Sequence, residues 1–78
     1  MVIKFTKHAL KQIRLRKITK NEVLTTLNTP DKLSQDKSGN SIAQKRFKNY
    51  LLRVFYLHEE DTKLVITAYK TSKLDKYK

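Results

Sequence analysis

The sequence predicts an α+β domain, in which a short N-terminal strand and two helices pack on an antiparallel sheet of three or four strands. Three observations support this prediction. Two helix-start signals lie in the first third of the chain, at Thr6 and Thr19. The only proline, Pro30, follows the second signal, and the only glycine, Gly39, lies in a polar turn soon after it. Beyond that turn the chain is rich in alternating β-branched and aromatic residues, which is typical of strands.

The first half of the chain is expected to form one strand and two helices. Val2 to Phe5 is the strand, and Thr6 then caps a helix that runs to about Lys17. Thr19 to Glu22 reads Thr-Lys-Asn-Glu, a capping box that begins the second helix. Pro30 ends that helix, because the residue before a proline is pushed out of helical geometry.

The second half is expected to form strands joined by short turns. The expected strands are a weak one over 31–35, followed by 42–47, 50–58 and 63–69. Residues 36–40 and 48–49 are turns, 59–61 form an acidic hairpin tip, and 71–78 form a basic tail. The whole chain, 1–78, is expected to be one domain, because two domains would average fewer than about 40 residues each.

Charge and composition narrow the class of protein. The 78 residues include 18 Lys and Arg against 7 Asp and Glu, which gives a formal net charge of +11. A small domain with this charge repels itself unless an anion shares its surface, so nucleic acid or an acidic protein is the expected partner. The chain has no cysteine, no Gly-rich phosphate loop and no apolar run that could span a membrane. We therefore expect a cytoplasmic protein with no metal, no cofactor and no membrane partner.

Alternation along the last two strands predicts which side chains share a face. The expected faces are Leu52, Val54 and Tyr56 opposite Arg53 and Phe55, and Val65, Thr67 and Tyr69 opposite Leu64, Ile66, Ala68 and Lys70. Basic residues interleaved with aromatic rings suit RNA, because phosphates bind the cations and unstacked bases pack on the rings. An ordinary solvated sheet face is the alternative.

The first predicted helix carries a histidine and an arginine on one ridge. At about 100° per residue, His8, Gln12 and Arg16 lie along the edge of the apolar stripe of the helix. An imidazole there can titrate near neutral pH and move a proton, and a guanidinium can grip a phosphate. The alternative is a partly exposed histidine at the edge of the core. His58 lies beside the acidic hairpin tip, which we interpret as a solvated turn and not as a metal site.

Two segments taken together resemble a known family. One is Phe5 to Leu10 followed by Arg14, Arg16 and Ile18-Thr19, with Pro30-Asp31 closing the second helix; the other is Leu51 to Tyr56 followed by Val65 to Ser72. The pattern resembles small prokaryotic domains that begin with a His-Ala helix and end with a Val-Ile-Thr-x-Tyr strand. Those domains are similar to the RelE/BrnT-like toxins and to metal-independent ribonucleases of barnase/RelE-type fold. The resemblance implies a RelE/barnase-like α+β fold and an endoribonuclease of toxin–antitoxin type that an acidic antitoxin protein inhibits.

Carried over by position, the resemblance matches His8, Arg16, Arg53, Thr67 and Tyr69. The predicted catalytic residues are His8, Arg16, Arg53 and Tyr69, with His8 moving a proton as the ribose 2′-hydroxyl attacks phosphorus. The residues predicted to bind RNA, including ribosome-associated mRNA, are Lys45, Arg46, Tyr56, Thr67 and Lys70. Relatives often carry Arg where this chain has Gln12, and Gly where it has Lys17. The alternatives are a non-catalytic RNA- or DNA-binding module and a small protein that docks an acidic partner.

Overall fold

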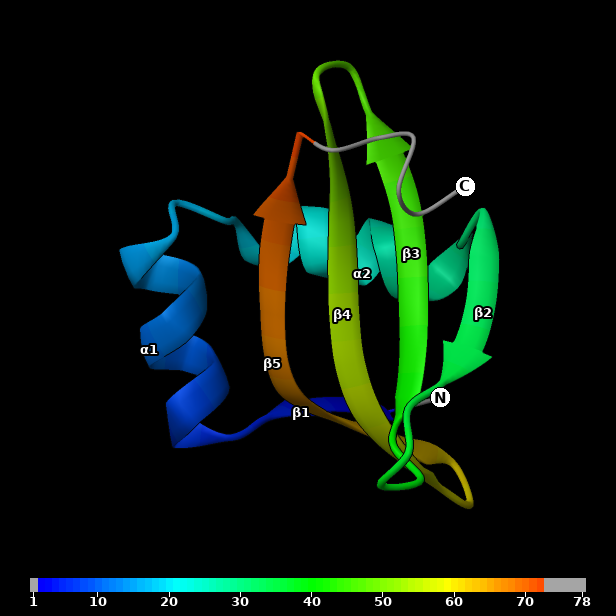
Figure 1. Cartoon of the computed structure of the whole chain (residues 1–78). Helices are drawn as coiled ribbons and strands as arrows, with labels where there is room; N and C mark the ends of the chain where they lie inside the picture. Colours follow the sequence, from blue (N-terminus) through cyan, green and yellow to red (C-terminus); the bar gives the residue numbers. More distant parts are fainter. Residues whose placement is uncertain (1, 73–78) are drawn as a thin grey trace.

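The computed structural model describes residues 2–72, which form two helices and a five-stranded sheet (Figure 1). The elements in chain order are β1 (Val2–Phe5), α1 (Lys7–Leu15), α2 (Lys20–Asn28), β2 (Lys32–Gln35), β3 (Ser41–Phe47), β4 (Tyr50–Glu59) and β5 (Thr62–Thr71). The predicted basic tail lies outside the described residues except for Thr71, which belongs to β5, and Ser72.

Both helices begin where the sequence predicts. The Thr6 hydroxyl accepts a hydrogen bond from the Ala9 N–H at 2.9 Å. Thr19 and Glu22 form the predicted capping box, in which the Glu22 N–H donates to the Thr19 hydroxyl at 3.1 Å and the Glu22 carboxylate accepts from the Thr19 N–H at 2.9 Å. Helix α1 ends at Leu15, slightly earlier than predicted, because Lys17 turns the chain with a left-handed φ of 56°.

The sheet has the strand order β1-β5-β4-β3-β2. Strands β2 to β5 pair antiparallel with their neighbours, whereas β1 pairs parallel with β5, so that Phe5 lies opposite Val65. The expectation of an antiparallel sheet of three or four strands was therefore wrong, and the sheet is mixed and five-stranded. The first strand of the chain, β1, pairs with the last strand, β5. Nothing in the sequence of residues 2–5 indicates which strand they pair with.

One face of the sheet meets both helices and holds the core. Helix α2 crosses that face, and α1 lies along the β5 edge (Figure 1). The core residues are Ala9 and Ile13 of α1, Ile18 between the helices, Val23 and Leu27 of α2, and Ala43, Leu52, Val54, Tyr56, Val65 and Ala68 of the sheet. The predicted assignment of Leu52, Val54 and Tyr56 to one face is confirmed. Side chains at the alternate positions of β4, such as Arg53, point away from the helices.

A β-bulge changes the predicted faces of β5. Phe55 lies opposite Thr67 but the next residue, Tyr56, lies opposite Val65, so Ile66 is an extra residue in β5. Val65 consequently joins Ala68 in the core, where each has no exposed surface. The expectation that Val65 shares a face with Thr67 was wrong, because strict alternation holds only where the ladder has no insertion.

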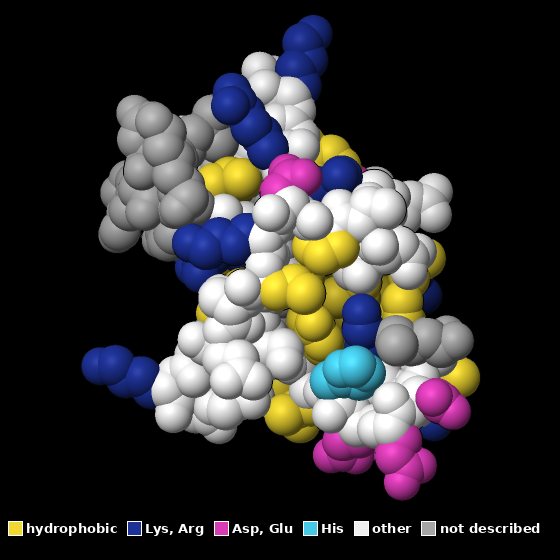
Figure 2. All heavy atoms as spheres, turned by 90° about the vertical axis from the view of Figure 1, so that its right-hand side faces the viewer, with side chains coloured by type: hydrophobic (Ala, Val, Ile, Leu, Met, Phe, Trp, Pro, Cys, Tyr) yellow, Lys and Arg dark blue, Asp and Glu magenta, His cyan; other side chains and the backbone are white. Residues whose placement is uncertain are grey.

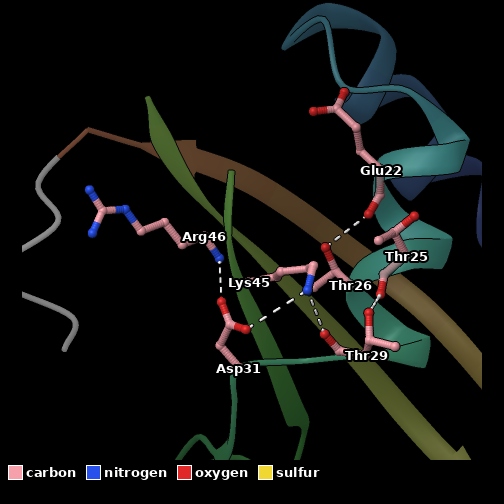
Figure 3. A network of polar contacts seen from close by, with 7 residues as sticks. All are labelled: Glu22, Thr25, Thr26, Thr29, Asp31, Lys45 and Arg46. Atoms are coloured by element: carbon pink, nitrogen blue, oxygen red, sulfur yellow. Dashed lines mark hydrogen bonds and ion pairs between the residues drawn. The ribbon is translucent and has the colours of Figure 1, made fainter. Parts of the chain in front are cut away.

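A polar network fixes β3 and β2 to the end of α2 (Figure 3). The Lys45 ammonium donates to the Thr29 carbonyl at 2.9 Å and lies 3.8 Å from the Asp31 carboxylate. The same carboxylate accepts the backbone N–H of Arg46 at 2.8 Å. Lys45 thus binds the C-terminus of α2, where a cation is favourable, and Asp31 holds the start of β2 beside β3.

Candidate functional site

Arg53 and Tyr69 lie directly opposite each other on the face of the sheet that the helices leave uncovered. Their strands, β4 and β5, pair antiparallel with Arg53 facing Tyr69 and Phe55 facing Thr67. All four side chains are half-buried. The bulged residue, Ile66, comes before Thr67 in the chain, so the pairing of Arg53 with Tyr69 and of Phe55 with Thr67 is regular.

Arg53, Phe55 and Tyr69 form one compact cluster, which we call the Arg53 platform. The Phe55 and Tyr69 rings are stacked with their centroids 6.0 Å apart and their planes at 28°. The Arg53 guanidinium carbon lies 5.6 Å from each centroid, and its Nη1 donates to the Tyr69 hydroxyl at 2.5 Å. Cation–π contacts and a hydrogen bond from a charged donor each favour this arrangement of the guanidinium and the two rings.

Arg16 reaches the same strand from the edge of the sheet. Its Nη1 donates to the carbonyl of Ala68 at 2.7 Å, next to Tyr69 in the chain. Arg16 caps the C-terminus of α1, which lies along the β5 edge, and the residue itself is exposed. The guanidinium therefore adds a positive charge at the border of the platform.

His8 lies apart from these three residues. It is exposed in the first turn of α1, eight positions before Arg16, a separation of about 12 Å along a helix axis. Within residues 2–72, no hydrogen bond or ring contact joins His8 to Arg16, Arg53 or Tyr69. The structure thus joins Arg53 and Tyr69 directly and bonds Arg16 to the neighbouring residue, Ala68, whereas His8 contacts none of the three.

Strand alternation divides the residues predicted to bind RNA. Thr67 and Arg46 lie on the uncovered face, Thr67 opposite Phe55 and Arg46 opposite Leu51, and the Arg46 side chain is exposed. In Figure 3 the Arg46 side chain extends away from α2, while that of its neighbour Lys45 points toward the helix.

Tyr56 and Lys70, with Lys45, lie on the helix-covered face. Tyr56 is only 4% exposed and belongs to the core, so its ring is not on the face that carries Arg53. The Lys70 ammonium donates to the Lys17 carbonyl at 2.9 Å and lies 4.7 Å from the centroid of the Tyr50 ring. These three side chains hold helix and sheet together and do not border the platform.

Phe55 belongs to the platform, although it is not among the predicted site residues. Its position two residues after Arg53 places it on the same face of β4, and its ring completes the contact with Tyr69. The alternation of side chains along β4 could have identified Phe55, because a ring two residues from an arginine lies on the same face of the strand and can stack with it.

The described part of the chain offers no clustered metal ligands. Among residues 2–72, no three His, Asp or Glu side chains come together in a group that could hold a metal ion. Over the same residues, no helix has the length and apolar composition needed to cross a membrane.

The comparisons with known proteins give one match. A family model described as a domain of unknown function, DUF4258, matches residues 5–70. That range contains α1, α2, β2 to β4, the whole Arg53 platform and Arg16. The comparison with curated proteins finds no match, and neither does the comparison with solved structures.

Proposed function

We propose that this chain, which belongs to the DUF4258 family, binds single-stranded RNA on the sheet face that the helices leave uncovered. The observation that carries the proposal is the Arg53 platform, in which a guanidinium is packed on two aromatic rings and bonded to a phenol hydroxyl. This combination offers a cation to a phosphate and ring surface to a base at the same place.

The charge of the chain supports a polyanionic ligand. A net charge of +11 on 78 residues attracts phosphates over the whole surface, and RNA binding releases the counterions that those phosphates hold. Charge alone does not select a face, so the position of the rings decides where the bases contact the protein.

The rings favour unpaired bases over duplex. In A-form RNA the bases are stacked inside the helix, whereas in single strands they can be turned out and packed on aromatic side chains. Phe55 and Tyr69 are stacked on each other at 6.0 Å between centroids, so a base has to pack on the outer surface of the pair. Arg16 at the β5 edge and Arg46 on the same face of β3 flank the rings with positive charge for the neighbouring phosphates.

A second candidate function, RNA cleavage, is favoured by the hydrogen bond between Arg53 and Tyr69 and by the resemblance to RelE/BrnT-like toxins. In this reaction the 2′-oxygen bonds to the adjacent phosphorus and the bond from phosphorus to the 5′-oxygen breaks. The 2′-hydroxyl loses a proton and the 5′-oxygen gains one, which leaves a 2′,3′-cyclic phosphate and a 5′-hydroxyl. Tyr69 is the candidate that the structure offers for one of these proton transfers, and His8, which contacts none of the other three residues, is the candidate that the resemblance implies for the other. Arg16 and Arg53 would stabilise the charge on the phosphorane.

The binding proposal is tested by fluorescence anisotropy with a labelled twelve-nucleotide RNA that has no secondary structure. Arg53→Gln and Lys37→Gln each remove one positive charge, but Lys37 lies in the turn between β2 and β3. We expect Arg53→Gln to weaken binding by about tenfold or more, as loss of a cation and stacking contact predicts, and Lys37→Gln to weaken it by no more than about twofold. An equal loss of RNA affinity in the two variants would show that binding depends only on overall charge, and it would contradict the proposal that the Arg53 platform is the binding site.

Phe55→Leu separates stacking from charge. Leucine keeps an apolar side chain but removes the ring. We expect a loss of affinity of about fivefold or more, because base–ring stacking contributes about 1–3 kcal/mol. Circular dichroism and urea unfolding on each variant establish that the fold is retained.

Cleavage is tested on the same RNA in EDTA, with products separated on a denaturing gel and their termini identified by mass spectrometry. A cyclic phosphate that disappears in Tyr69→Phe supports the second candidate function and assigns Tyr69 to it. Binding without any product leaves RNA binding as the function, and product formed equally by His8→Ala and the unaltered chain removes His8 from the catalytic set.

A further inference from the structure

Two apolar side chains are buried on the sheet face that the helices leave uncovered. Ile42 and Leu51 are 5% and 6% exposed, yet neither belongs to the core between the sheet and the helices. Ile42 lies opposite Phe55, and Leu51 lies two positions before Arg53, so both share the face of the Arg53 platform. Gln44, which is 7% exposed, lies on the same face opposite Arg53. The open face of an antiparallel sheet is ordinarily polar and solvated, so a cover is expected over these three side chains.

The neighbouring side chains of the strands do not provide that cover. Leu51 lies between the exposed Arg46 and the end of β5. Ile42 lies between Ser34, which is short and exposed, and Phe55, whose ring is stacked on a ring of β5. Both helices lie elsewhere, α2 on the opposite face and α1 along the β5 edge (Figure 1). The exposed fractions are those of a single chain, so the cover belongs to this chain and not to a partner.

A row of polar residues crosses the same face from β5 to β2. In register order the row is Tyr69, Arg53, Gln44 and Lys32. All four, together with Thr71 at the end of β5, take part in a further polar, charged or ring interaction. These interactions mark a line of contact that runs across the strands and starts where β5 ends.

Residues 73–78 follow Ser72, one residue after the end of β5. Six extended residues span about 20 Å, whereas the three strand spacings from β5 to β2 amount to about 14 Å. The segment reads Lys-Leu-Asp-Lys-Tyr-Lys, so it carries two apolar side chains, Leu74 and Tyr77, and one carboxylate, Asp75. It therefore has the length and the side chains that a cover for this face requires.

We propose that residues 73–78 lie across this face, with their apolar side chains over Leu51 and Ile42 and with Asp75 beside the cations of the row. RNA then has to displace the segment to reach the Arg53 platform. This second step rests on the proposed function, because it concerns the same site, whereas the cover itself does not depend on RNA.

The charges on this face favour the exchange of the segment for RNA. The cations are Lys32, Arg46 and Arg53, and the segment brings three lysines and only one carboxylate to them. The carboxylates of residues 59–61 lie at the far end of β4, about 20 Å from Arg53 along the strand. Figure 2 shows acidic side chains gathered at that lower end of the molecule. Asp31, beside β2, is engaged by the polar network at the end of α2. Apolar contact therefore holds the segment, and a polyanion gains from the cations that the segment leaves without a counter-charge.

The cover is tested by paramagnetic relaxation in the full chain, which has no cysteine of its own. A nitroxide attached to Lys76→Cys broadens the resonances of nearby methyl groups, and the label reduced with ascorbate supplies the reference. We expect the methyl groups of Ile42 and Leu51 to broaden more than those of Leu52, the neighbour that faces the helices. Equal broadening at Leu51 and Leu52, or broadening confined to the end of β5, would overturn the cover. So would broadening in a mixture of spin-labelled chain and unlabelled, isotope-enriched chain, because the segment of a second copy would then lie on the face.

RNA supplies the second readout. We expect the twelve-nucleotide RNA to remove the broadening at Ile42. Leu74→Ser keeps the charge of the segment, and we expect it to raise RNA affinity about threefold or more, because a larger fraction of the chain is then open for binding. Leu15→Ser, at a position of α1 that is 65% exposed, is the matched control and is expected to leave RNA affinity unchanged.

The two readouts separate this inference from the proposed function. Broadening at Ile42 that persists in the RNA-saturated chain would overturn RNA binding on this face, together with the exchange, and would retain the cover. A face that the nitroxide finds open in the free chain would overturn the cover and leave the proposed function intact.

Discussion

The Arg53 guanidinium and the Tyr69 hydroxyl are joined by a hydrogen bond of 2.5 Å across the β4–β5 pair. The two residues are direct register partners, and the Phe55 ring lies against both of them. Each group is thereby held in one conformation by the others. A site with that property binds a ligand without first having to order its own side chains.

The contribution of the contact between Arg53 and Tyr69 to the free energy of unfolding can be measured. Tyr69→Phe removes only the hydroxyl, and Arg53→Met removes the guanidinium while keeping a flexible apolar side chain. We expect a double-mutant cycle in urea to give a coupling energy of about 1 kcal/mol, since a half-buried hydrogen bond to a charged group is partly screened. A coupling energy near zero would show that the contact contributes nothing in solution.

Lys17→Gly is expected to stabilise the chain. Lys17 has a φ of 56°, a left-handed conformation that costs a residue with a Cβ about 1–2 kcal/mol and costs glycine almost nothing. The Lys70 ammonium donates to the backbone carbonyl of Lys17, and that contact survives the substitution. We predict a free energy of unfolding higher by about 1 kcal/mol.

The control for Lys17→Gly is Arg14→Gly in the last turn of α1. Glycine there is expected to destabilise the chain by about 1 kcal/mol, because the backbone is helical at that position. A lower stability in both variants would contradict the assigned role of Lys17 at the end of α1.

Thr19→Ala tests the capping box of α2. The substitution removes the hydroxyl that accepts the Glu22 N–H, and it leaves one end of the reciprocal pair unsatisfied. We expect a loss of about 1 kcal/mol in thermal or urea unfolding. Thr25→Ala, at an exposed position inside the same helix, is expected to be neutral or slightly stabilising, because alanine is the better helix former.

Asp36 is expected to make stability depend on pH in the acid range. Desolvation acts to raise the pKa of Asp36, but hydrogen bonds from Asn40 and Ser38 outweigh it and hold the pKa below the ordinary value of 3.8. A carboxyl with a lowered folded-state pKa contributes stability above the unfolded-state pKa and loses it as the pH falls through the folded-state value. The excess stability of the unaltered chain over Asp36→Asn should therefore be constant near neutral pH and shrink below about pH 4.

Urea unfolding at a series of pH values from 7 to about 2 measures this difference. Asp61→Asn, which removes an exposed carboxyl from the turn between β4 and β5, serves as the control. A stability difference that grows on acidification would contradict the assigned direction of the Asp36 shift.

The candidate site could be predicted in part from the sequence. Alternation along β4 and β5 placed Arg53 and Tyr69 on one face, and the same rule extends to Phe55. It also separates the neighbours Lys45 and Arg46, although the predicted RNA-binding set contained both. Whether His8 comes near Arg53 and Tyr69 depends on how α1 packs against β5, which no spacing within the helix reveals.

Signals that act over a few residues determined the helices and turns of this protein. Each of three features depends on contacts between residues within about four positions of each other: the Thr19–Glu22 capping box, the end of α2 before Pro30 and the turn at Gly39. Such features can therefore be predicted from the local sequence alone. The tertiary structure alone decided the sheet order, the parallel pairing of Phe5 with Val65 and the bulge at Ile66. These features arise from packing between segments that are up to 60 positions apart, where many registers satisfy the same local pattern and only burial against the helices selects one.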